Sequence, residues 1–438
     1  MQKTDVVIIG GGPAGMAAAI SCSNAGAKCM LIERDYRLGG ILNQCIHNGF
    51  GLHYFKQELT GPEYAARFEE KLKQTNALIL LNTFVTEIEL KSEHTRKQSH
   101  TKNGQQHNAA KKIVTIISQN GLEQIETKAI ILAMGCRERA AGAIFLAGDR
   151  PAGIFTAGLA QKIINCEGRS IGKKAVILGS GDIGLIMARR LVCEGTPVAG
   201  VFEIMPSSSG LKRNIAQCLN DYNIPLHLNT TISRVIGKQR IEAVEIVEVN
   251  ADLSFKNETR RIIECDTLLL SVGLIPENDL VTNLSVEFCP LTGGATTDEF
   301  GQTSAEGIFS CGNVMHVHDL VDNVSYEAEK AGKYAAAYAK GKLQKSTAVK
   351  VLYDKNIRYV QPETLYAAEN TVTSALQKVL LFFRVNSEMR NVKIVVTCSD
   401  KVIAQKACLI VTPGEMQEIE IEKAKITGSV TVSIQPLT

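Results

Sequence analysis

The chain opens with an unbroken apolar run, residues 6–9, followed by three glycines and a run of small apolar residues, 14–20. A short, wholly apolar run is typical of a strand buried on both faces of a parallel sheet, and the alanine-rich run predicts a helix. The glycines therefore occupy a strand-to-helix turn. A second apolar run, residues 29–32, predicts the next strand of the same sheet.

The glycines of this turn have the spacing of a pyrophosphate-binding turn. Gly10 permits the tight turn, Gly12 leaves room for a phosphate near backbone N–H groups, and Gly15 lets helix and strand pack closely. Glu33 ends the second strand, where its carboxylate can accept hydrogen bonds from the ribose of an adenosine. The pattern predicts nucleotide binding, and the alternative is a glycine-rich turn in an ordinary α/β domain.

The same arrangement occurs a second time. An apolar run, 175–178, leads into a glycine-rich turn and a helix, and the next apolar run, 198–202, ends at Glu203. A carboxylate at this position accepts a free 2′-hydroxyl and repels a 2′-phosphate, which favours NAD over NADP. Two further apolar strands end at Gly135 and Gly273, as expected for backbone packed close to a nucleotide. The repetition predicts two nucleotide sites on one chain.

Other segments follow simpler patterns. Helices are predicted over 60–72 and 326–340, and alternating strands over 78–90 and 112–134. A very polar stretch, 91–111, joins these strands and contains His94, His100 and His107. Because the histidines are irregularly spaced, we expect a mobile hairpin loop, and the alternative is a metal-binding tract.

The composition changes after about residue 346. Several short apolar runs separated by turn residues follow, at 379–385, 392–397, 402–411, 416–421 and 429–434. They predict a small antiparallel β-sandwich. It contains no glycine fingerprint and no catalytic constellation, so its expected role is interaction or structural support.

The composition excludes several classes of protein. A chain of 438 residues, 45% hydrophobic with a net charge of +3, has no basic surface suited to nucleic acid. Its twelve cysteines are scattered, which disfavours a disulfide framework or a structural metal. No apolar run is long enough to span a bilayer, and the first strand begins too early for a signal peptide. We therefore expect a cytoplasmic protein.

The paired fingerprints, the strand ends at Gly135 and Gly273, and the stretch 303–313 resemble flavoproteins with two dinucleotide-binding domains, the relatives of glutathione and thioredoxin reductases. The resemblance implies an α/β fold in which a NAD domain is inserted into a split FAD domain. The expected limits are 1–150 and 293–345 for the FAD domain, 151–292 for the NAD domain and 346–438 for the β-sandwich. Gly312 and Asn313 occupy the ribityl-binding motif, with Asn where the family usually has Asp.

The cysteines depart from the disulfide reductases of that family. Glutathione reductase relatives carry a Cys-x4-Cys pair soon after the two glycines, but Leu42 occupies the first of these positions here and only Cys45 stands nearby. Cys166 stands alone where thioredoxin reductases carry a CxxC pair. A single thiol cannot store two electrons as an intramolecular disulfide. Cys45 is then either a reactive thiol beside the flavin or a packing residue.

Several longer motifs are similar to a narrower group. They lie at 38–51, 60–64, 133–139, 150–158, 179–190, 210–214 and 311–325. This group comprises FAD/NAD oxidoreductases found with anaerobic-type glycerol-3-phosphate dehydrogenases and, more distantly, the α subunits of opine oxidase, proline dehydrogenase and hydrogen cyanide synthase. The resemblance implies a partner flavoprotein dehydrogenase subunit in a hetero-complex or oligomer.

The polar stretch 316–323 follows the ribityl motif, and the resemblance places it near the flavin. We expect His316, His318 and Cys45 to be catalytic or close to the flavin. One alternative is a metal site, although no metal ligands are predicted; the other is helix capping by Asp322 or Asn323 with exposed histidines. The expected cofactor-binding residues are Gly10, Gly12, Pro13, Ala14, Gly15, Glu33, Arg34, Gly40, Gln44, Gly135, Gly179, Gly181, Asp182, Ile183, Gly184, Glu203, Gly273, Gly312 and Asn313.

Three functions remain open from the sequence. The first is an NADH-linked flavoprotein subunit with FAD and NAD that exchanges electrons with a partner dehydrogenase. The second is a self-sufficient flavin dehydrogenase or oxidase for a small amine, amino acid or opine-like substrate. The third is a redox scaffold whose β-domain docks a partner.

Overall fold

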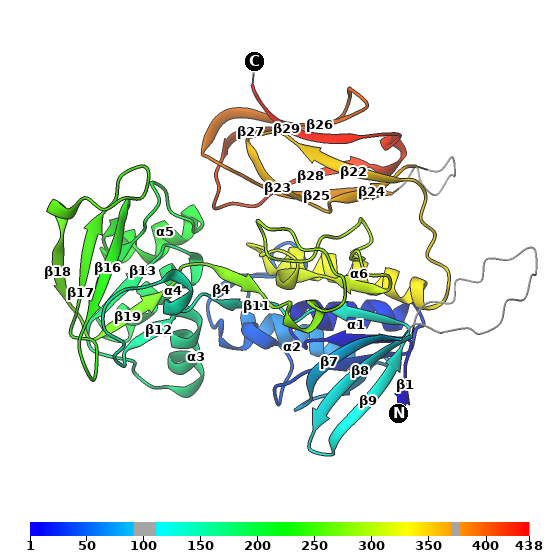
Figure 1. Ribbon diagram of the computed structural model, residues 1–438, viewed down its shortest axis with the longest axis horizontal. Coiled ribbons are helices and arrows are strands. Elements are labelled where there is room, and N and C mark those ends of the chain that lie inside the picture. Colours follow the sequence, from blue (N-terminus) through cyan, green and yellow to red (C-terminus); the bar gives the residue numbers. More distant parts are fainter. Residues whose placement is uncertain (92–110, 369–376, 438) are drawn as a thin grey trace, which may run out of the picture. The chain divides into compact units, whose positions relative to one another are not determined.

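The structure, a computed structural model, describes residues 1–91, 111–368 and 377–437. The predicted polar loop with His94, His100 and His107 lies outside these residues. The chain forms two compact units (Figure 1). The first consists of Met1–Cys136, Pro276–Thr412 and Met416–Thr438, and the second of Arg137–Ile275 and Pro413–Glu415.

A parallel five-stranded sheet forms the centre of the first unit. In sheet order its strands are β21 (Ile308–Ser310), β10 (Ala129–Leu132), β2 (Val6–Ile9), β3 (Cys29–Ile32) and β6 (Leu78–Leu80). Every residue of β2, β3 and β10 is buried, as their unbroken apolar sequences predicted. Because β21 comes from far along the chain, this sheet is assembled from two separate segments.

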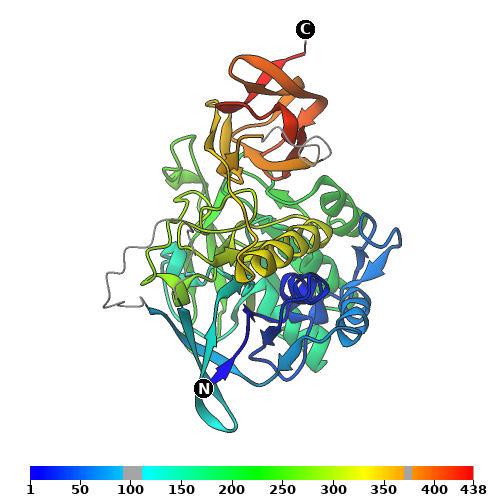
Figure 2. The ribbon, with the colours of Figure 1, turned by 90° about the vertical axis from the view of Figure 1, so that its right-hand side faces the viewer.

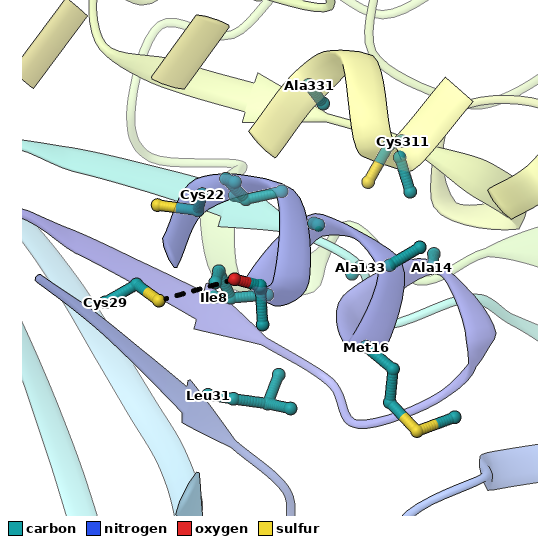
Figure 3. Packing of buried hydrophobic residues seen from close by; sticks show 14 of the residues in the cluster. Ile8, Ala14, Met16, Cys22, Cys29, Leu31, Ala133, Cys311 and Ala331 are labelled. Carbon is teal, nitrogen blue, oxygen red and sulfur yellow. Dashed lines mark hydrogen bonds between the residues drawn. The ribbon is translucent and has the colours of Figure 1, made fainter. Parts of the chain in front are cut away.

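Two helices pack side by side against this sheet, α1 (Pro13–Asn24) and α6 (Val321–Ala339) (Figures 1 and 2). A Cβ at Gly332 would lie 2.3 Å from the carbonyl oxygen of Ala18, so glycine is what permits this close approach. Small side chains such as Ala14 and Ala331 belong to the same buried cluster (Figure 3). The alanine-rich sequence of α1 thus serves helix-to-helix packing as well as helix formation.

The other helices and strands of the N-terminal part of the first unit surround this sheet. Helix α2 (Gly61–Lys73) begins where the sequence predicted, with a capping box between Thr60 and Glu63. The others are η1 (Gly40–Gln44), the pair β4 (Asn48–Phe50) and β5 (Leu59–Thr60), and a four-stranded sheet of β1 (Gln2–Lys3), β9 (Gly121–Thr127), β8 (Lys111–Ser118) and β7 (Phe84–Lys91).

The second unit repeats the plan. Its parallel sheet contains β12 (Ile154–Thr156), β19 (Thr267–Leu270), β13 (Ala175–Leu178), β14 (Val198–Phe202) and β15 (Leu226–His227). Its helices are α3 (Ala157–Glu167), α4 (Asp182–Cys193) and α5 (Lys212–Cys218), and an antiparallel sheet contains β16 (Thr230–Ile236), β17 (Ala243–Glu248) and β18 (Arg261–Glu264). The two chain crossings, β11 (Cys136–Glu138) and β20 (Leu274–Pro276), form a two-stranded pair.

The C-terminal segment of the first unit is a two-sheet structure around one core. One sheet contains β24 (Thr364–Tyr366), β22 (Ala348–Tyr353), β29 (Val430–Pro436), β26 (Met389–Cys398) and β27 (Lys401–Val411), and the other contains β23 (Ile357–Gln361), β25 (Lys378–Val385) and β28 (Gln417–Glu422). The strands pair antiparallel, as expected, except that β22 pairs with β29 in parallel. The sequence pattern also missed β22, β23 and β24, whose short runs mix tyrosine and charged residues with apolar ones.

Candidate functional site

The first glycine turn combines tight internal packing with one open position. A Cβ at Gly10, whose φ is +104°, would lie 2.5 Å from the Ala133 carbonyl oxygen, and one at Gly15 would lie 1.7 Å from the Gly10 carbonyl oxygen. A Cβ at Gly12 would meet nothing within 4 Å. Helix α1 begins at Pro13, and no side chain caps it. The open space beside uncapped first-turn N–H groups, among them that of Ala14, fits the pyrophosphate of FAD.

The acidic residue at the end of β3 anchors this turn. The buried Glu33 carboxylate accepts hydrogen bonds from the N–H of Gly11 at 2.6 Å and of Asp35 at 2.8 Å. Each carboxylate oxygen has further acceptor capacity, so the arrangement also fits a ribose hydroxyl. Gly40 adjoins the turn, since its Cβ would lie 3.1 Å from the Gly12 Cα, whereas Arg34 is exposed.

The second turn has the same hydrogen bonds. The buried Glu203 carboxylate, which follows β14, accepts hydrogen bonds from the N–H of Ser180 and of Met205, both at 3.0 Å, and from the Ser180 hydroxyl at 2.6 Å. Gly179 has a φ of +89°, and its Cβ would lie 2.2 Å from the Ser271 carbonyl oxygen. The repetition predicted from apolar runs therefore extends to individual hydrogen bonds.

The start of α4 differs from the start of α1. Gly181 is the N-cap, again without a side-chain hydrogen bond to cap the helix. The Asp182 carboxylate accepts hydrogen bonds from the Leu211 N–H at 2.8 Å and from the Asn214 amide at 2.6 Å. Asp182 therefore positions the start of α5. The neighbouring Ile183 packs against the apolar core of this unit.

Close packing explains Gly184, and backbone conformation explains Gly135 and Gly273. A Cβ at Gly184 would lie 2.6 Å from the Ser271 Cβ, so a side chain there would collide with the strand end. Gly135 and Gly273 have φ angles of +74° and +103°, in the left-handed region that favours glycine. Gly135 has open space around its Cβ position.

The predicted ribityl-binding motif forms hydrogen bonds with residues that follow it. The Gly312 N–H donates to Glu327 Oε2 at 2.6 Å, and Asn313 Oδ1 accepts a hydrogen bond from the His318 N–H at 3.0 Å. The second bond fixes the orientation of the Asn313 amide. Its NH2 group is then the part that can donate to a ligand hydroxyl.

His316 and His318 lie together on one buried carboxylate. Their Nε2 atoms are 3.1 and 3.2 Å from Glu327 Oε1 and Oε2, and both rings are fully buried. Burial, with the neighbouring His318, lowers the pKa of His316 to about 4. Although burial opposes ionisation of Glu327, the two histidines hold its pKa well below its usual range. The cluster therefore consists of two imidazoles whose Nε2 atoms donate to one carboxylate, and burial keeps the His316 ring neutral.

The helix-capping alternative is wrong. It requires exposed histidines and a cap by Asp322 or Asn323, but the histidines are buried. Helix α6 has Leu320 as its N-cap, without a side-chain cap, and Asp322 lies within its first turn. There the buried Asp322 carboxylate accepts a hydrogen bond from the His53 N–H at 3.2 Å.

Within the residues that the structure describes, His316, His318 and Glu327 form the one group of side chains close enough together to bind a metal ion. One ligand atom from each of His316, His318 and Glu327 lies within 4.8 Å of the others. Metal-bound histidines usually donate their other ring nitrogen to an acceptor, yet neither Nδ1 atom has a hydrogen-bond partner. The geometry therefore fits a hydrogen-bonded cluster better than a metal centre.

The segment around Cys45 lies on a separate element. Gln44 is the last residue of η1 and is buried, and the Cys45 thiol lies 3.3 Å from the Ile41 carbonyl oxygen. A Cβ at Gly61 would lie 2.8 Å from the Cys45 Cβ, so this cysteine packs against the start of α2. All twelve cysteines are free thiols.

Sequence analysis missed Glu327, the residue that joins the two histidines. It lies in a helix rich in Ala, Glu and Lys, where a glutamate is normally solvated. A signal existed nonetheless: Glu327 is at helical spacing from Val324 and Ala331, which lie on the buried face of α6.

Comparison with known proteins identifies the family. The sequence model of the pyridine nucleotide-disulphide oxidoreductases matches residues 4–375. The chain belongs to this family. The family's enzymes use FAD and a pyridine nucleotide, so this oxidoreductase uses the two kinds of cofactor that the resemblance implied, in keeping with the two nucleotide sites that its glycine turns predicted. The predicted α/β fold with two dinucleotide-binding units is likewise confirmed.

Individual relatives are distant. The oxidoreductase is 27% identical to the thioredoxin reductase of Ureaplasma parvum, over 77% of this chain and 96% of that protein. It is 25% identical to an opine oxidase subunit of Agrobacterium tumefaciens and to the hydrogen cyanide synthase subunit HcnB of Pseudomonas protegens, over 76% and 64% of this chain. The matches span only 65% and 59% of those two relatives.

Among solved structures, the thioredoxin reductase of T. acidophilum shares the fold with a TM-score of 0.61 at 19% identity, over 78% of this chain and 99% of that one. The thioredoxin reductase of Lactococcus lactis has a TM-score of 0.58 at 21% identity, over 77% and 99%. Among the helices in the described ranges, none combines the length and hydropathy needed to cross a membrane.

Proposed function

We propose that this oxidoreductase exchanges a hydride between NAD(H) and FAD and passes electrons to or from a partner dehydrogenase subunit, without a redox-active disulfide. The observation that carries the proposal is the repeated turn, in which Glu33 and Glu203 accept the same pattern of hydrogen bonds from two separate glycine turns. FAD, when bound, supplies a ring that accepts or releases a hydride. The chain's task is to bind and orient the two cofactors.

Particular residues support the proposal that the first unit binds FAD and the second binds the pyridine nucleotide. The uncapped start of α1 and the open space at Gly12 suit the FAD pyrophosphate, and the Asn313 amide is oriented to donate to the ribityl chain. In the second unit, the buried Glu203 carboxylate favours a nucleotide with a free 2′-hydroxyl. We therefore propose NAD as the pyridine nucleotide.

The absence of a dithiol relay is supported by the position of the thiols. Cys45 packs at the start of α2 and Cys166 lies exposed on α3, each without a cysteine at the reductase spacing. Scattered free thiols are also typical of a reducing compartment, and we propose that the protein is cytoplasmic.

A partner dehydrogenase is supported by the relatives. The opine oxidase relative and HcnB are both named as subunits, and both match the chain over more than half of its length. The longer motifs resemble proteins found with anaerobic-type glycerol-3-phosphate dehydrogenases, so we propose a partner of that type.

A second candidate function is a self-sufficient dehydrogenase or oxidase for a small amine, amino acid or opine-like substrate. It is favoured by the His316 and His318 pair, whose buried Nδ1 atoms lack hydrogen-bond partners. A neutral imidazole in this state can accept a proton from a substrate.

An anaerobic titration of the FAD-loaded full chain tests both proposals. We expect NADH to bleach the flavin absorbance faster than NADPH, while glycerol 3-phosphate and proline leave it unchanged without a partner. Bleaching by an amino acid or amine alone would favour the second function. A flavin that neither nucleotide reduces would contradict the first.

A further inference from the structure

The C-terminal sandwich contacts the loop that carries the two histidines. Arg384 on β25 forms an ion pair with Asp319 and donates a hydrogen bond to the Val317 carbonyl oxygen at 3.3 Å. Both charged side chains are only 15% exposed. A guanidinium from the sandwich thus binds the residue between the histidines and the residue after them.

Aromatic side chains of the sandwich cover the histidine rings. The Phe382 ring centroid lies 5.3 Å from that of His318, at 88°, and 5.8 Å from that of His316. Tyr359 on β23 approaches His316 edge-on, with centroids 6.2 Å apart. These contacts contribute to the complete burial of the two imidazole rings.

Strand β25 makes contacts through the side chains of both its faces. Leu381, Phe383 and Val385 point into the core of the sandwich, and Phe382 and Arg384 alternate with them and face the histidine loop. The N–H of Met416, just before β28, adds a hydrogen bond to Asp319 Oδ2 at 2.6 Å. The loop is therefore held from outside by the sandwich and from inside by Glu327.

We propose that the C-terminal sandwich is an integral part of the redox site, in which Arg384 and Phe382 are positioning residues for His316 and His318. The inference rests on the proposed function and on the expectation, from the family resemblance, that the histidines lie near the flavin. Strand β25 begins after residue 375, where the match to the family model ends, so these contacts add to the dinucleotide-binding fold. On this proposal, the C-terminal sandwich completes the redox site and does more than support the fold.

The test compares four single variants of the FAD-loaded full chain: Arg384→Gln, Asp319→Asn, Phe382→Leu and, as control, Arg390→Gln. Arg390 lies on β26 of the same sandwich and pairs with Glu388 at the surface. Two quantities are measured, the rate of flavin reduction by NADH and the flavin midpoint potential in a dithionite titration against a reference dye. Thermal unfolding of each variant is recorded in parallel.

We expect Arg384→Gln to lower the midpoint potential, because it removes the positive charge that balances the Asp319 carboxylate. Arg384→Gln and Phe382→Leu should each slow flavin reduction at least about tenfold, a change of about 1.4 kcal/mol in barrier. Arg390→Gln should change neither quantity. Asp319→Asn leaves the Arg384 guanidinium without its counter-charge and should raise the potential instead.

The proposal is overturned if Arg384→Gln and Phe382→Leu lower only the unfolding temperature while potential and rate stay at the parent values. If Arg384→Gln does not fold, Phe382→Leu and Asp319→Asn decide by the same two readouts. Failure of the proposed function has a different signature, because NADH would not reduce the parent flavin while dithionite would still give a midpoint potential for each variant.

Discussion

Asn313 stands where the flavoproteins that this chain resembles usually carry aspartate, and its amide oxygen is already occupied by the His318 N–H. Asn313→Asp keeps an acceptor for that N–H and adds a negative charge. If the motif lies along the ribityl chain, the charge opposes reduction of the flavin. We expect FAD to be retained and the flavin midpoint potential to fall in a dithionite titration. An unchanged potential would place residue 313 away from the flavin.

Gly12 is the glycine of the first turn whose identity is not required by the chain's own packing. A valine there has free space and an allowed backbone, since φ is −73°. Gly12→Val should therefore leave the thermal unfolding of the apoprotein unchanged but fill the pyrophosphate position, weakening FAD binding at least about tenfold. Gly142→Val is the matched control, because a Cβ there also meets nothing within 4 Å. Full flavin absorbance in Gly12→Val would refute the assignment.

His316 gives a pH dependence of stability. Its pKa falls from 6.5 to about 4 on folding, so the unfolded chain binds more protons in this range. The contribution of His316 to the free energy of unfolding is fully present above pH 6.5 and is lost as the pH falls towards 4. Between pH 7.5 and pH 5 the free energy of unfolding should fall by about 2 kcal/mol. Urea unfolding at these two pH values should show the loss in the parent and in His53→Gln, whose histidine is exposed. A His316→Gln protein that shows the same loss would contradict this account.

At the level of elements, the strand-to-helix turns were predictable because everything they need is local. Apolar runs such as 175–178 predict the buried strands, and glycine spacing predicts the turns. The burial of His316 and His318 was not predictable, because their neighbours are Glu327, on the next helix, and Phe382, from a strand far along the chain. Short strands such as β22 were missed since alternation over so few residues is a weak signal.

The repeated turn supplies a pair of matched variants. Glu203→Gln keeps an acceptor oxygen for Ser180 or Met205 and removes the charge that repels a 2′-phosphate. The ratio of flavin reduction rates with NADH and NADPH should fall roughly tenfold, about 1.4 kcal/mol. Glu33→Gln makes the same change in the first unit and should alter FAD retention instead of this ratio. An unchanged ratio in Glu203→Gln would show that the carboxylate does not select the nucleotide.

For the molecule as a whole, the proposed route of electrons avoids sulfur. Cys45→Ser, Cys166→Ser and the double variant should each transfer electrons from NADH to a dye within roughly tenfold of the parent rate. As a control, the FAD content of each variant is compared with that of the parent protein. A loss of several orders of magnitude with FAD still bound would put a thiol in the chemical path and move the protein towards the disulfide reductases.

The order of strands in the larger sheet of the sandwich has a consequence for synthesis. Strand β29, the last along the chain, lies inside the sheet between β22 and β26, and is not an edge strand. Strands β22 and β26 are therefore synthesised before the strand that joins them, whereas the dinucleotide-binding units can begin folding as they emerge from the ribosome. If the sandwich completes the redox site, a chain truncated before residue 430 lacks the strand between β22 and β26, and we expect it to lose the contacts that hold the histidine loop.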